Sequence, residues 1–368
     1  MKISCIAQKL KNNTQLSEKF IFKTHTITAL TGIKISADKN ITLSSTNLSA
    51  GLSVIIPGKI DQIGEIIVPG TVFTQIINTF SDDEPITIEL DKNQCIISSP
   101  RSRTIIPTLI LGDFPSIPKL IPEGNNVFSY DIQNLLTGIK SVSFAALSSD
   151  IKPEISSVYW YENEIGSVFV ATDAFRLAEK TIPLPKKPDH NGILLPLKNI
   201  PELIRVLSDY TGPVDIIISP HQISITHKDF YYTSRLVSGN YPSYKMIIPE
   251  KYETFVVLDK SEVVKTLRGT AIFHDRFNQV KMHIQPDLAQ VSFTVNHSER
   301  GEMVTHIPAK ISGPEVEMII HQKNLTDVLN IISEESIELK IVNSIKPLMI
   351  SGTHNMDFLY IMMPINRV

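Results

Sequence analysis

Apolar residues follow the same order three times along this chain. In each copy a run of three apolar residues precedes apolar positions at i, i+3, i+4 and i+7, with mostly polar residues between them. The run predicts a buried strand, and the spaced positions predict a short helix with one apolar face. The copies are Ile66–Val68 with Phe73, Ile76, Ile77 and Phe80; Ile193–Leu195 with Ile200, Leu203, Ile204 and Leu207; and Met318–Ile320 with Leu325, Val328, Leu329 and Ile332.

The distance between the copies indicates whole domains. Corresponding points of the copies lie 127 and 125 residues apart. A second phrase, Gly-Asp-Phe-Pro-Ser at 112–116, returns 127 residues later as Gly-Asn-Tyr-Pro-Ser at 239–243. Solenoid repeats are only about 20 to 50 residues long, so the copies are too far apart for a solenoid. The 368-residue chain is predicted to form three domains, at residues 1–121, 122–249 and 250–368.

Each copy also opens with a second predicted helix. These helices cover residues 7–21, residues 129–144 and a segment after Asp259, which has a Glu three residues later as in a capping box. Elsewhere apolar and polar residues alternate, as at 86–90 and 222–226, which predicts strands. Each domain is therefore predicted to be α+β, with two helices packed on antiparallel sheets. The proline-containing linkers at 118–126 and 248–253 are predicted to hold neighbouring domains at nearly fixed angles.

The composition is that of ordinary globular domains, with 42% hydrophobic residues, 20% charged residues and a net charge of −3. Cys5 and Cys95 fit neither a disulfide framework nor a metal-ligand spacing, so a reducing cytoplasm is expected. No run of 18 apolar residues and no signal-peptide pattern occurs, so no membrane partner is expected. The net charge does not exclude nucleic acid, because phosphate contacts depend on where Lys and Arg are placed.

The sequence contains no motif of a familiar catalytic site. It has no phosphate-binding glycine loop, dinucleotide-binding loop, zinc-protease motif or nucleophile elbow. Three weaker candidates are better explained by structure: residues 82–84 as a solvated turn, residues 297–299 as a loop, and Trp160 as a core residue. The sequence therefore predicts no catalytic residue, no metal and no cofactor.

The most specific motif is Thr-Asp-Ala-Phe-Arg-Leu-Ala at 172–178, in the second of the three copies. Together with Gly-Asp-Phe-Pro at 112–115, Gly-Asn-Tyr-Pro at 239–242 and Met-Pro near the end at 363–364, it resembles the bacterial DNA polymerase III beta subunit, the beta sliding clamp family. The resemblance covers the whole chain. It implies a DNA-clamp fold of three similar domains, and a head-to-tail dimeric ring with helices lining the hole and sheets outside.

The resemblance also implies a function. A sliding clamp is a non-catalytic processivity factor that encircles duplex DNA without sequence preference. It tethers the replicative polymerase, the clamp loader and other proteins with a clamp-binding motif through an apolar cleft between domains two and three. Residues 71–80 contain no Lys or Arg, which leaves two alternatives open: a repeat-built protein-binding scaffold that does not encircle DNA, and an accessory clamp paralogue.

Site residues follow from the resemblance, position by position. The cleft positions are Ile155, Thr172, Ala174, Phe175, Arg176, Leu177, Pro242, Met246, Ile247, Met362, Met363, Pro364 and Ile365. The DNA-binding positions are Lys23, Lys140, Lys152, Lys198 and Arg205, and the dimer-interface positions are Ile106, Ile272 and Phe273. Solvated surface charge and packing within a domain are the alternative explanations for the last two sets.

Three departures from the family pattern affect the cleft. Ala174 and Phe175 replace the usual Gly and His, Met246 stands where a basic residue is common, and the tail after Pro364 is one residue longer. A groove rich in Met can adapt to many linear peptides because Met side chains repack easily. Because the three departures change the lining of this groove, the preferred peptide is expected to differ from that of other family members.

Overall fold

The structure is a computed structural model that describes residues 1–122, 126–149, 151–184, 190, 192–273, 277–355 and 357–365. Parts of two predictions, residues 123–125 of the first linker and residues 366–368 of the tail, lie outside the described residues. The chain divides into two compact units. The first unit contains residues 1–136 and 198–238, and the second contains residues 137–197 and 239–368.

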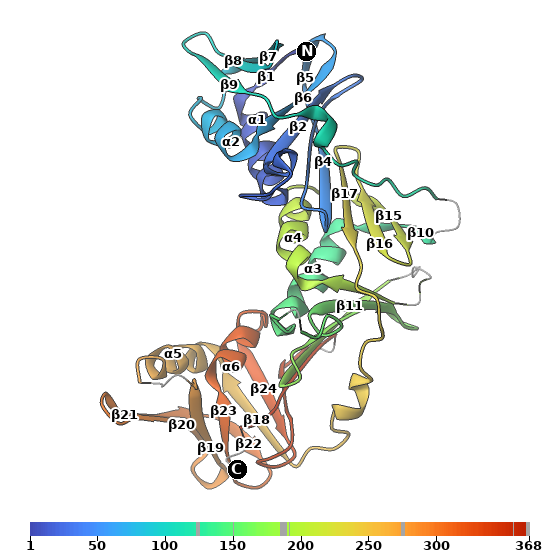
Figure 1. Ribbon diagram of the computed structural model, residues 1–368. Coiled ribbons are helices and arrows are strands. Elements are labelled where there is room, and N and C mark those ends of the chain that lie inside the picture. Colours follow the sequence, from blue (N-terminus) through green and yellow to red (C-terminus); the bar gives the residue numbers. More distant parts are fainter. Residues whose placement is uncertain are drawn as a thin grey trace. The chain divides into compact units, whose positions relative to one another are not determined.

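Each predicted helix is present (Figure 1). The α-helices are α1 (Ala7–Ser17), α2 (Gly70–Asn78), α3 (Ile132–Val142), α4 (Ile200–Ser208), α5 (Lys260–Thr270) and α6 (Gln322–Leu329). The short 3₁₀ helices include η1 (Glu18–Phe20), η4 (Ser143–Ala145), η5 (Leu197–Asn199), η6 (Tyr244–Ile247) and η7 (Pro286–Leu288). The predicted cap of α5 is confirmed, because the Asp259 carboxylate accepts the backbone N–H of Glu262 at 3.1 Å.

One predicted helix start was wrong by three residues. The helix predicted from Ser129 begins at Ile132, because residues up to Asp131 belong to strand β10, which pairs with β15. The Asp131 carboxylate then accepts the backbone N–H groups of Gln133 and Asn134, at 2.9 and 3.2 Å. Strand pairing and this cap decide the boundary, and the apolar period alone does not reveal either.

The first unit contains two antiparallel sheets. A five-stranded sheet has the order β5-β1-β7-β8-β9, and an eight-stranded sheet has the order β10-β15-β16-β17-β4-β3-β2-β6. The strands are β1 (Lys2–Ile6), β2 (Gly32–Ala37), β3 (Ile41–Thr46), β4 (Ala50–Ile56), β5 (Gly58–Gln62), β6 (Gly64–Pro69), β7 (Pro85–Asp91), β8 (Gln94–Ser98), β9 (Arg103–Pro107), β10 (Asn126–Asp131), β15 (Pro213–Ser219), β16 (Gln222–Thr226) and β17 (Phe230–Arg235).

The second unit also has two antiparallel sheets. Their orders are β14-β11-β12-β13-β26-β25-β24-β18-β22 and β21-β20-β19-β23. The strands are β11 (Ser157–Glu162), β12 (Gly166–Thr172), β13 (Arg176–Pro183), β14 (Ile193–Pro196), β18 (Thr254–Asp259), β19 (Gln279–Gln285), β20 (Gln290–His297), β21 (Gly301–Pro308), β22 (Lys310–Ser312), β23 (Val316–His321), β24 (Ser336–Ile341), β25 (Leu348–Gly352) and β26 (Phe358–Met362).

The largest sheet of each unit runs across a junction between two sequence repeats. In the first unit β4 pairs with β17, from Val54 opposite Phe230 to Ala50 opposite Ser234. In the second unit β13 pairs with β26. The second repeat contributes strands to both units, which is why the units do not coincide with the three repeats. The predicted domain boundaries therefore stay a prediction at this point.

Helices cover the sheets as the apolar stripes predict. In the first unit α1 packs on β3 and β4, while α2 packs on β2 and β6 (Figure 1). Thr74, placed by its sequence position on the polar face of α2, is buried instead, and its hydroxyl donates to the carbonyl of Thr14 on α1 at 3.4 Å. Contact between the two helices thus covers a residue that the amphipathic pattern alone would expose.

The structure agrees with the structural explanations of the weaker candidates. Residues 82 and 83 form an exposed turn, and residues 298–300 connect β20 and β21. Trp160 is fully buried, and Cys5 and Cys95 are buried free thiols. Within the described residues, no helix is long and apolar enough to cross a membrane and no group of side chains could hold a metal ion.

Candidate partner-binding site

The motif at 172–178 forms the turn between β12 and β13. The Thr172 hydroxyl donates to the carbonyl of Arg176 at 2.6 Å and accepts the N–H of Ala174 at 3.1 Å. The Asp173 carboxylate accepts the N–H groups of Phe175 and Arg176, each at 2.9 Å. Thr and Asp are needed here because their short side chains satisfy the backbone of a tight turn.

Ala174 has a left-handed backbone at this turn, with φ of 75°. Residues other than Gly adopt this region at a cost of roughly 1–2 kcal/mol. The turn geometry therefore explains why Gly is usual at this position, and it makes Ala174 a strained residue in this chain.

Arg176 joins three segments of the second unit. Its Nε donates to Asp173 Oδ2 at 2.9 Å, its Nη1 to Asp327 Oδ2 on α6 at 2.7 Å, and its Nη2 to the carbonyl of Phe144 at 2.7 Å. The guanidinium also lies 5.5 Å from the centre of the Phe144 ring. Burial by itself would lower the pKa of Arg176, but the bond to Asp327 and the nearby charges outweigh it and raise the pKa.

Arg176 was predicted to be the basic residue of the cleft wall, and the structure gives it a different part. Its side chain is only 8% exposed and is bonded to two carboxylates. It therefore holds the turn against η4 and α6 and does not offer a free charge to a ligand. The reason could not be read from the motif, because Asp327 lies 151 residues away in the sequence.

Strand register corrects the prediction for Met362. Arg176 pairs with Met362 and Leu177 pairs with Ile361, so Met362 and Leu177 point to opposite faces of the sheet. Met362 is fully buried on the Arg176 face, whereas Ile361 packs with Leu177 and Tyr244. Ile361 is thus the residue that the sequence reasoning missed, and the two-residue strand period is the signal that could have found it.

The Gly-Asn-Tyr-Pro segment covers the Leu177 face of the same sheet. The Tyr241 ring stacks on Tyr159 with centroids 4.8 Å apart, and the Tyr244 hydroxyl is hydrogen bonded to the Tyr161 hydroxyl at 2.8 Å. The Tyr244 hydroxyl also donates to the carboxylate of Glu179. Burial, followed by the charge of Glu179 and the hydrogen bond to it, raises the pKa of Tyr244, which stays protonated. These contacts fix the segment on the sheet.

The β12–β13 turn and residues 242–247 together leave apolar side chains in solvent. Met246 is 84% exposed, Phe175 is 68% exposed and Ile247 is 50% exposed, and Pro242 is also exposed. Exposed Met and aromatic side chains beside an ordered scaffold are typical of protein-binding surfaces.

The chain's end completes this surface. The backbone N–H of Met363 donates to the carbonyl of Phe175 at 2.8 Å, and that of Ile365 donates to the carbonyl of Ile319 at 2.7 Å. Met363 and Ile365 are half-buried, and Pro364 is buried between them. Ile155 and Thr172 are buried, Ala174 is exposed, and Leu177 is fully buried beneath the segment. The predicted cleft residues therefore include both buried and exposed side chains, and Met362 lies on the sheet face opposite Leu177.

Comparison with known families gives three matches in chain order. The N-terminal domain of the DNA polymerase III beta subunit matches residues 1–118, the central domain matches residues 131–243, and the C-terminal domain matches residues 245–366. Together the matches cover nearly the whole chain. This chain belongs to the DNA polymerase III beta subunit family.

Curated relatives are similar in sequence over most of the chain, and solved structures have the same fold. The chain is 27% identical to the beta sliding clamp of Pseudomonas putida over 303 residues, 82% of each chain, and 24% identical to that of Staphylococcus aureus over 366 residues, 96% of each. The solved structures of the Pseudomonas aeruginosa clamp bound to griselimycin and of the Thermotoga maritima beta subunit superpose with TM-scores of 0.93 and 0.92. Each match covers 100% of both chains at 24% sequence identity. The predicted three-domain clamp fold is confirmed, and ring-shaped dimers are typical of this family.

The five predicted DNA-binding positions are all exposed. Lys198 on η5 and Arg205 on α4 belong to one helical segment of the first unit, and Lys23 follows η1 in the same unit. Lys140 is in the last turn of α3 and Lys152 is in a turn before β11, both in the second unit. Helix α1 contacts both α2 and α4, so the first-unit helices form a connected layer.

The three predicted dimer-interface residues differ in exposure. Ile272 is 63% exposed just after α5, and Phe273 is half-buried beside it. Ile106 is only 5% exposed because it points into its own domain, so it has little surface for a second chain. Its neighbour Ile105 is 45% exposed, since successive strand residues face opposite sides, and Ile105 replaces Ile106 as the candidate contact.

Proposed function

We propose that this chain is a sliding clamp, which encircles duplex DNA as a homodimer and tethers the replicative polymerase, the clamp loader and other partners. The observation that carries the proposal is the ordered match of all three beta-subunit domains over residues 1–366. The clamp performs no catalysis. It works in the cytoplasm, where bacterial chromosomal DNA lies.

Strand order supports a head-to-tail dimer. In the first unit, β4 ends the meander β2-β3-β4 and pairs with β17, which ends the meander β15-β16-β17 of the next repeat. In the second unit, β13 ends the meander β11-β12-β13 and pairs with β26, which ends the meander β24-β25-β26 of the next repeat. By the same logic, β21 of the third repeat would pair with β9 of the first repeat. Within the described residues both lie at the edge of a sheet, so β21 of one chain can extend the sheet of β9 in a second chain.

This pairing is heterologous and closes only at one geometry. Two chains supply six repeats, and joining β21 to β9 at both ends closes a ring if each repeat contributes a sixth of a turn. Ile272 lies at the correct edge, because Arg300, in the turn leading to β21, donates to the Ile272 carbonyl at 3.3 Å. Ile272, Phe273 and Ile105 are therefore the proposed apolar contacts of the dimer.

The proposed DNA contacts are weak and independent of sequence. Lys23, Lys140, Lys152, Lys198 and Arg205 would face the phosphates from the helical side of their units. Such contacts give non-specific affinities of roughly 10⁻⁴ to 10⁻⁶ M at physiological salt. Weak binding suits a ring, because linkage retains it on DNA while low affinity permits sliding.

Primer extension on a long single-stranded circle, with the polymerase and clamp loader of the same host, tests the function. We expect the chain to lengthen the products made in one polymerase binding event. The Phe273→Arg variant should be monomeric and inactive, because an unpaired charge in an apolar contact costs several kcal/mol. Products of equal length with and without the wild-type chain would contradict the proposal.

A double substitution tests the partner site separately. Met363→Ala with Pro364→Ala should reduce the affinity for a peptide from the host polymerase at least tenfold in fluorescence polarisation, while light scattering shows an intact dimer. Leu288→Ala is the matched control, because Leu288 is also apolar and is 61% exposed. It lies on η7 between β19 and β20, which belong to the four-stranded sheet. Unchanged affinity in the double variant would place the site elsewhere.

A further inference from the structure

The turn of the candidate site has a structural copy in the first unit. The turn between β3 and β4 carries Thr46 and Ala50, each 126 residues before Thr172 and Arg176. The Thr46 hydroxyl donates to the Ala50 carbonyl at 2.8 Å and accepts the N–H of Leu48 at 3.1 Å, as Thr172 does in its own turn. Leu48 has a φ of 66°, close to the 75° of Ala174.

The neighbouring strand repeats the match. The N–H of Arg235 donates to the carbonyl of Ser49 at 2.9 Å, just as the N–H of Met363 donates to that of Phe175 at 2.8 Å. Because β17 pairs with β4 as β26 pairs with β13, Arg235 occupies the position of Met363. The backbone frame proposed to bind partners is therefore present twice in one chain.

The covering segment is repeated as well. Residues 115–118 lie over β4 as the Gly-Asn-Tyr-Pro segment lies over β13. Gly51 stands where Leu177 stands in the other site, and a Cβ on Gly51 would be 3.0 Å from Cγ2 of Ile117. The Tyr231 hydroxyl ties the segment down by donating to the carbonyl of Pro118 at 2.8 Å and accepting the N–H of Leu120 at 3.1 Å.

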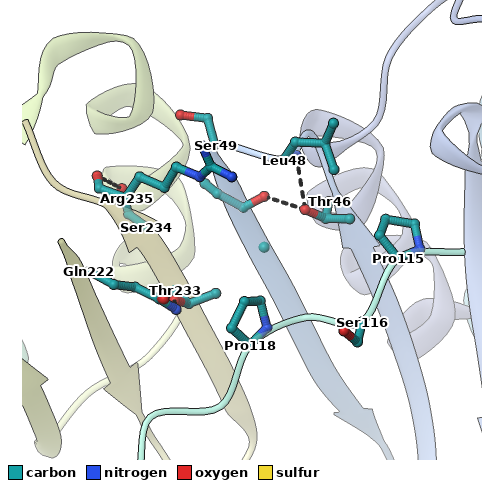
Figure 2. Close-up of a pocket in the computed structure, with 12 residues that line it drawn as sticks. Thr46, Leu48, Ser49, Pro115, Ser116, Pro118, Gln222, Thr233, Ser234 and Arg235 are labelled. Atoms are coloured by element: carbon teal, nitrogen blue, oxygen red, sulfur yellow. Dashed lines mark hydrogen bonds between the residues drawn. The ribbon is translucent and has the colours of Figure 1, made fainter. Parts of the chain in front are cut away.

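A pocket of about 180 Å³ opens at this place (Figure 2). It is smaller than the roughly 300–1,000 Å³ of a drug-sized ligand site, so it suits one or two side chains of a longer segment. Figure 2 shows the Arg235 side chain reaching across the pocket from β17 towards Ser49, with Pro115 and Pro118 on the other side. The lining residues are Thr46, Leu48, Ser49, Ala50, Gly51, Pro115, Ser116, Pro118, Gln222, Thr233, Ser234 and Arg235.

The chemistry of the pocket favours an acidic side chain. Arg235 is exposed, forms no ion pair with a carboxylate of the described residues, and is the one charged residue among those that line the pocket. Ser and Thr hydroxyls surround it, while Leu48 and the prolines supply apolar walls. A guanidinium with hydroxyl neighbours binds carboxylates well, because Arg can donate two parallel hydrogen bonds.

We propose that this pocket is a second docking site, which takes an extended partner segment presenting an Asp or Glu beside an apolar residue such as Leu. The segment would place its carboxylate on Arg235 and its apolar residue against Leu48 and the prolines. The inference rests on the proposed partner site, whose backbone frame it shares, but it assigns a different ligand preference because Arg235 replaces Met363. One clamp chain could then engage two segments of the same partner, or two different partners.

Binding of acetyl-Ala-Leu-Asp-Ala-amide to the full-length chain, measured by saturation-transfer NMR titration, tests the proposal. We expect binding in the millimolar range, weakened at least threefold when Asp is replaced by Asn. Arg235→Gln should weaken binding of the Asp peptide to the level of the Asn peptide. Ser116→Tyr should abolish it, because Ser116 is exposed at the pocket and a larger side chain fills the space.

Variants separate the failure of this site from the failure of the first. Met363→Ala should leave binding of the Asp peptide unchanged, and Arg235→Gln should leave binding of the polymerase peptide unchanged. No detectable binding, or binding that survives both Arg235→Gln and Ser116→Tyr, would overturn the second site without touching the first. Equal displacement of the Asp peptide by inorganic phosphate and by acetate at the same concentration would show a simple anion site and would also overturn it.

Discussion

At the residue scale, the turn at 172–176 shows which parts of a site a motif can predict. Thr172 and Asp173 were identified by residue type, and their hydrogen bonds explain why the motif needs them. The part played by Arg176 could not be predicted, because it depends on Asp327 on a distant helix. Ile361 was missed because the alternation of faces along β26 was not applied to the motif. Local chemistry is visible in the sequence, whereas partners brought together by folding are not.

Ala174→Gly is predicted to stabilise the protein. Gly adopts a φ of 75° without the penalty that Ala carries, and the larger backbone entropy that Gly loses on folding offsets part of this gain. The free energy of unfolding should therefore rise by about 0.5–1 kcal/mol. Thermal unfolding would measure the change. Ala171→Gly is the control, because Ala171 is a buried residue of β12. Removing its methyl group should lower the free energy of unfolding by about 0.5–1 kcal/mol. A variant at 174 that is less stable than the wild type would contradict the account of the turn.

At the element scale, the apolar period located every α-helix and misjudged mainly their edges. The start of α3 was set by the pairing of β10 with β15, and burial of Thr74 was set by contact between α1 and α2. The N-terminus of α6 is a further example. His321 occupies the N-cap position without forming a side-chain cap, although Asn or Asp would be the better residue there.

His321 should make the protein less stable in mild acid. Burial, then the charges of Arg176 and Lys323, lower its pKa below 6.5, and this outweighs the opposing effect of Asp173 and Asp327. The folded state therefore prefers neutral His321, and stability falls as pH drops from about 6.5 towards the lowered pKa. A protonated side chain would also oppose the helix dipole.

His321→Asn should remove this loss and supply a cap. Urea unfolding should show a larger gain over the wild type at pH 5 than at pH 8, where the gain should be about 1 kcal/mol from capping alone. His354→Asn is the control, because His354 is exposed in the turn after β25 and occupies no helix N-cap. An equal gain at both pH values would contradict the lowered pKa.

At the scale of the whole molecule, the repeat explains both the architecture and the sites. Three copies of one α+β pattern are linked by sheets that run across the junctions between copies. The two equivalent turns proposed to bind partners, β3–β4 and β12–β13, lie at these junctions. The repeat and its spacing were visible in the sequence. The equivalence of the two junctions was not, because Thr46-Asn47-Leu48-Ser49 and Thr172-Asp173-Ala174-Phe175 share only their first residue type and a left-handed third position.

The most direct test of encirclement is retention on DNA of controlled topology. The chain would be loaded by its clamp loader onto nicked circular DNA, separated by gel filtration at high salt, and the circle then cut once. We expect the protein to stay on the intact circle and to leave after the cut, because a ring is held by linkage and not by adhesion. Protein that never remains on the circle, or that remains equally on circular and linear DNA, would contradict a sliding ring.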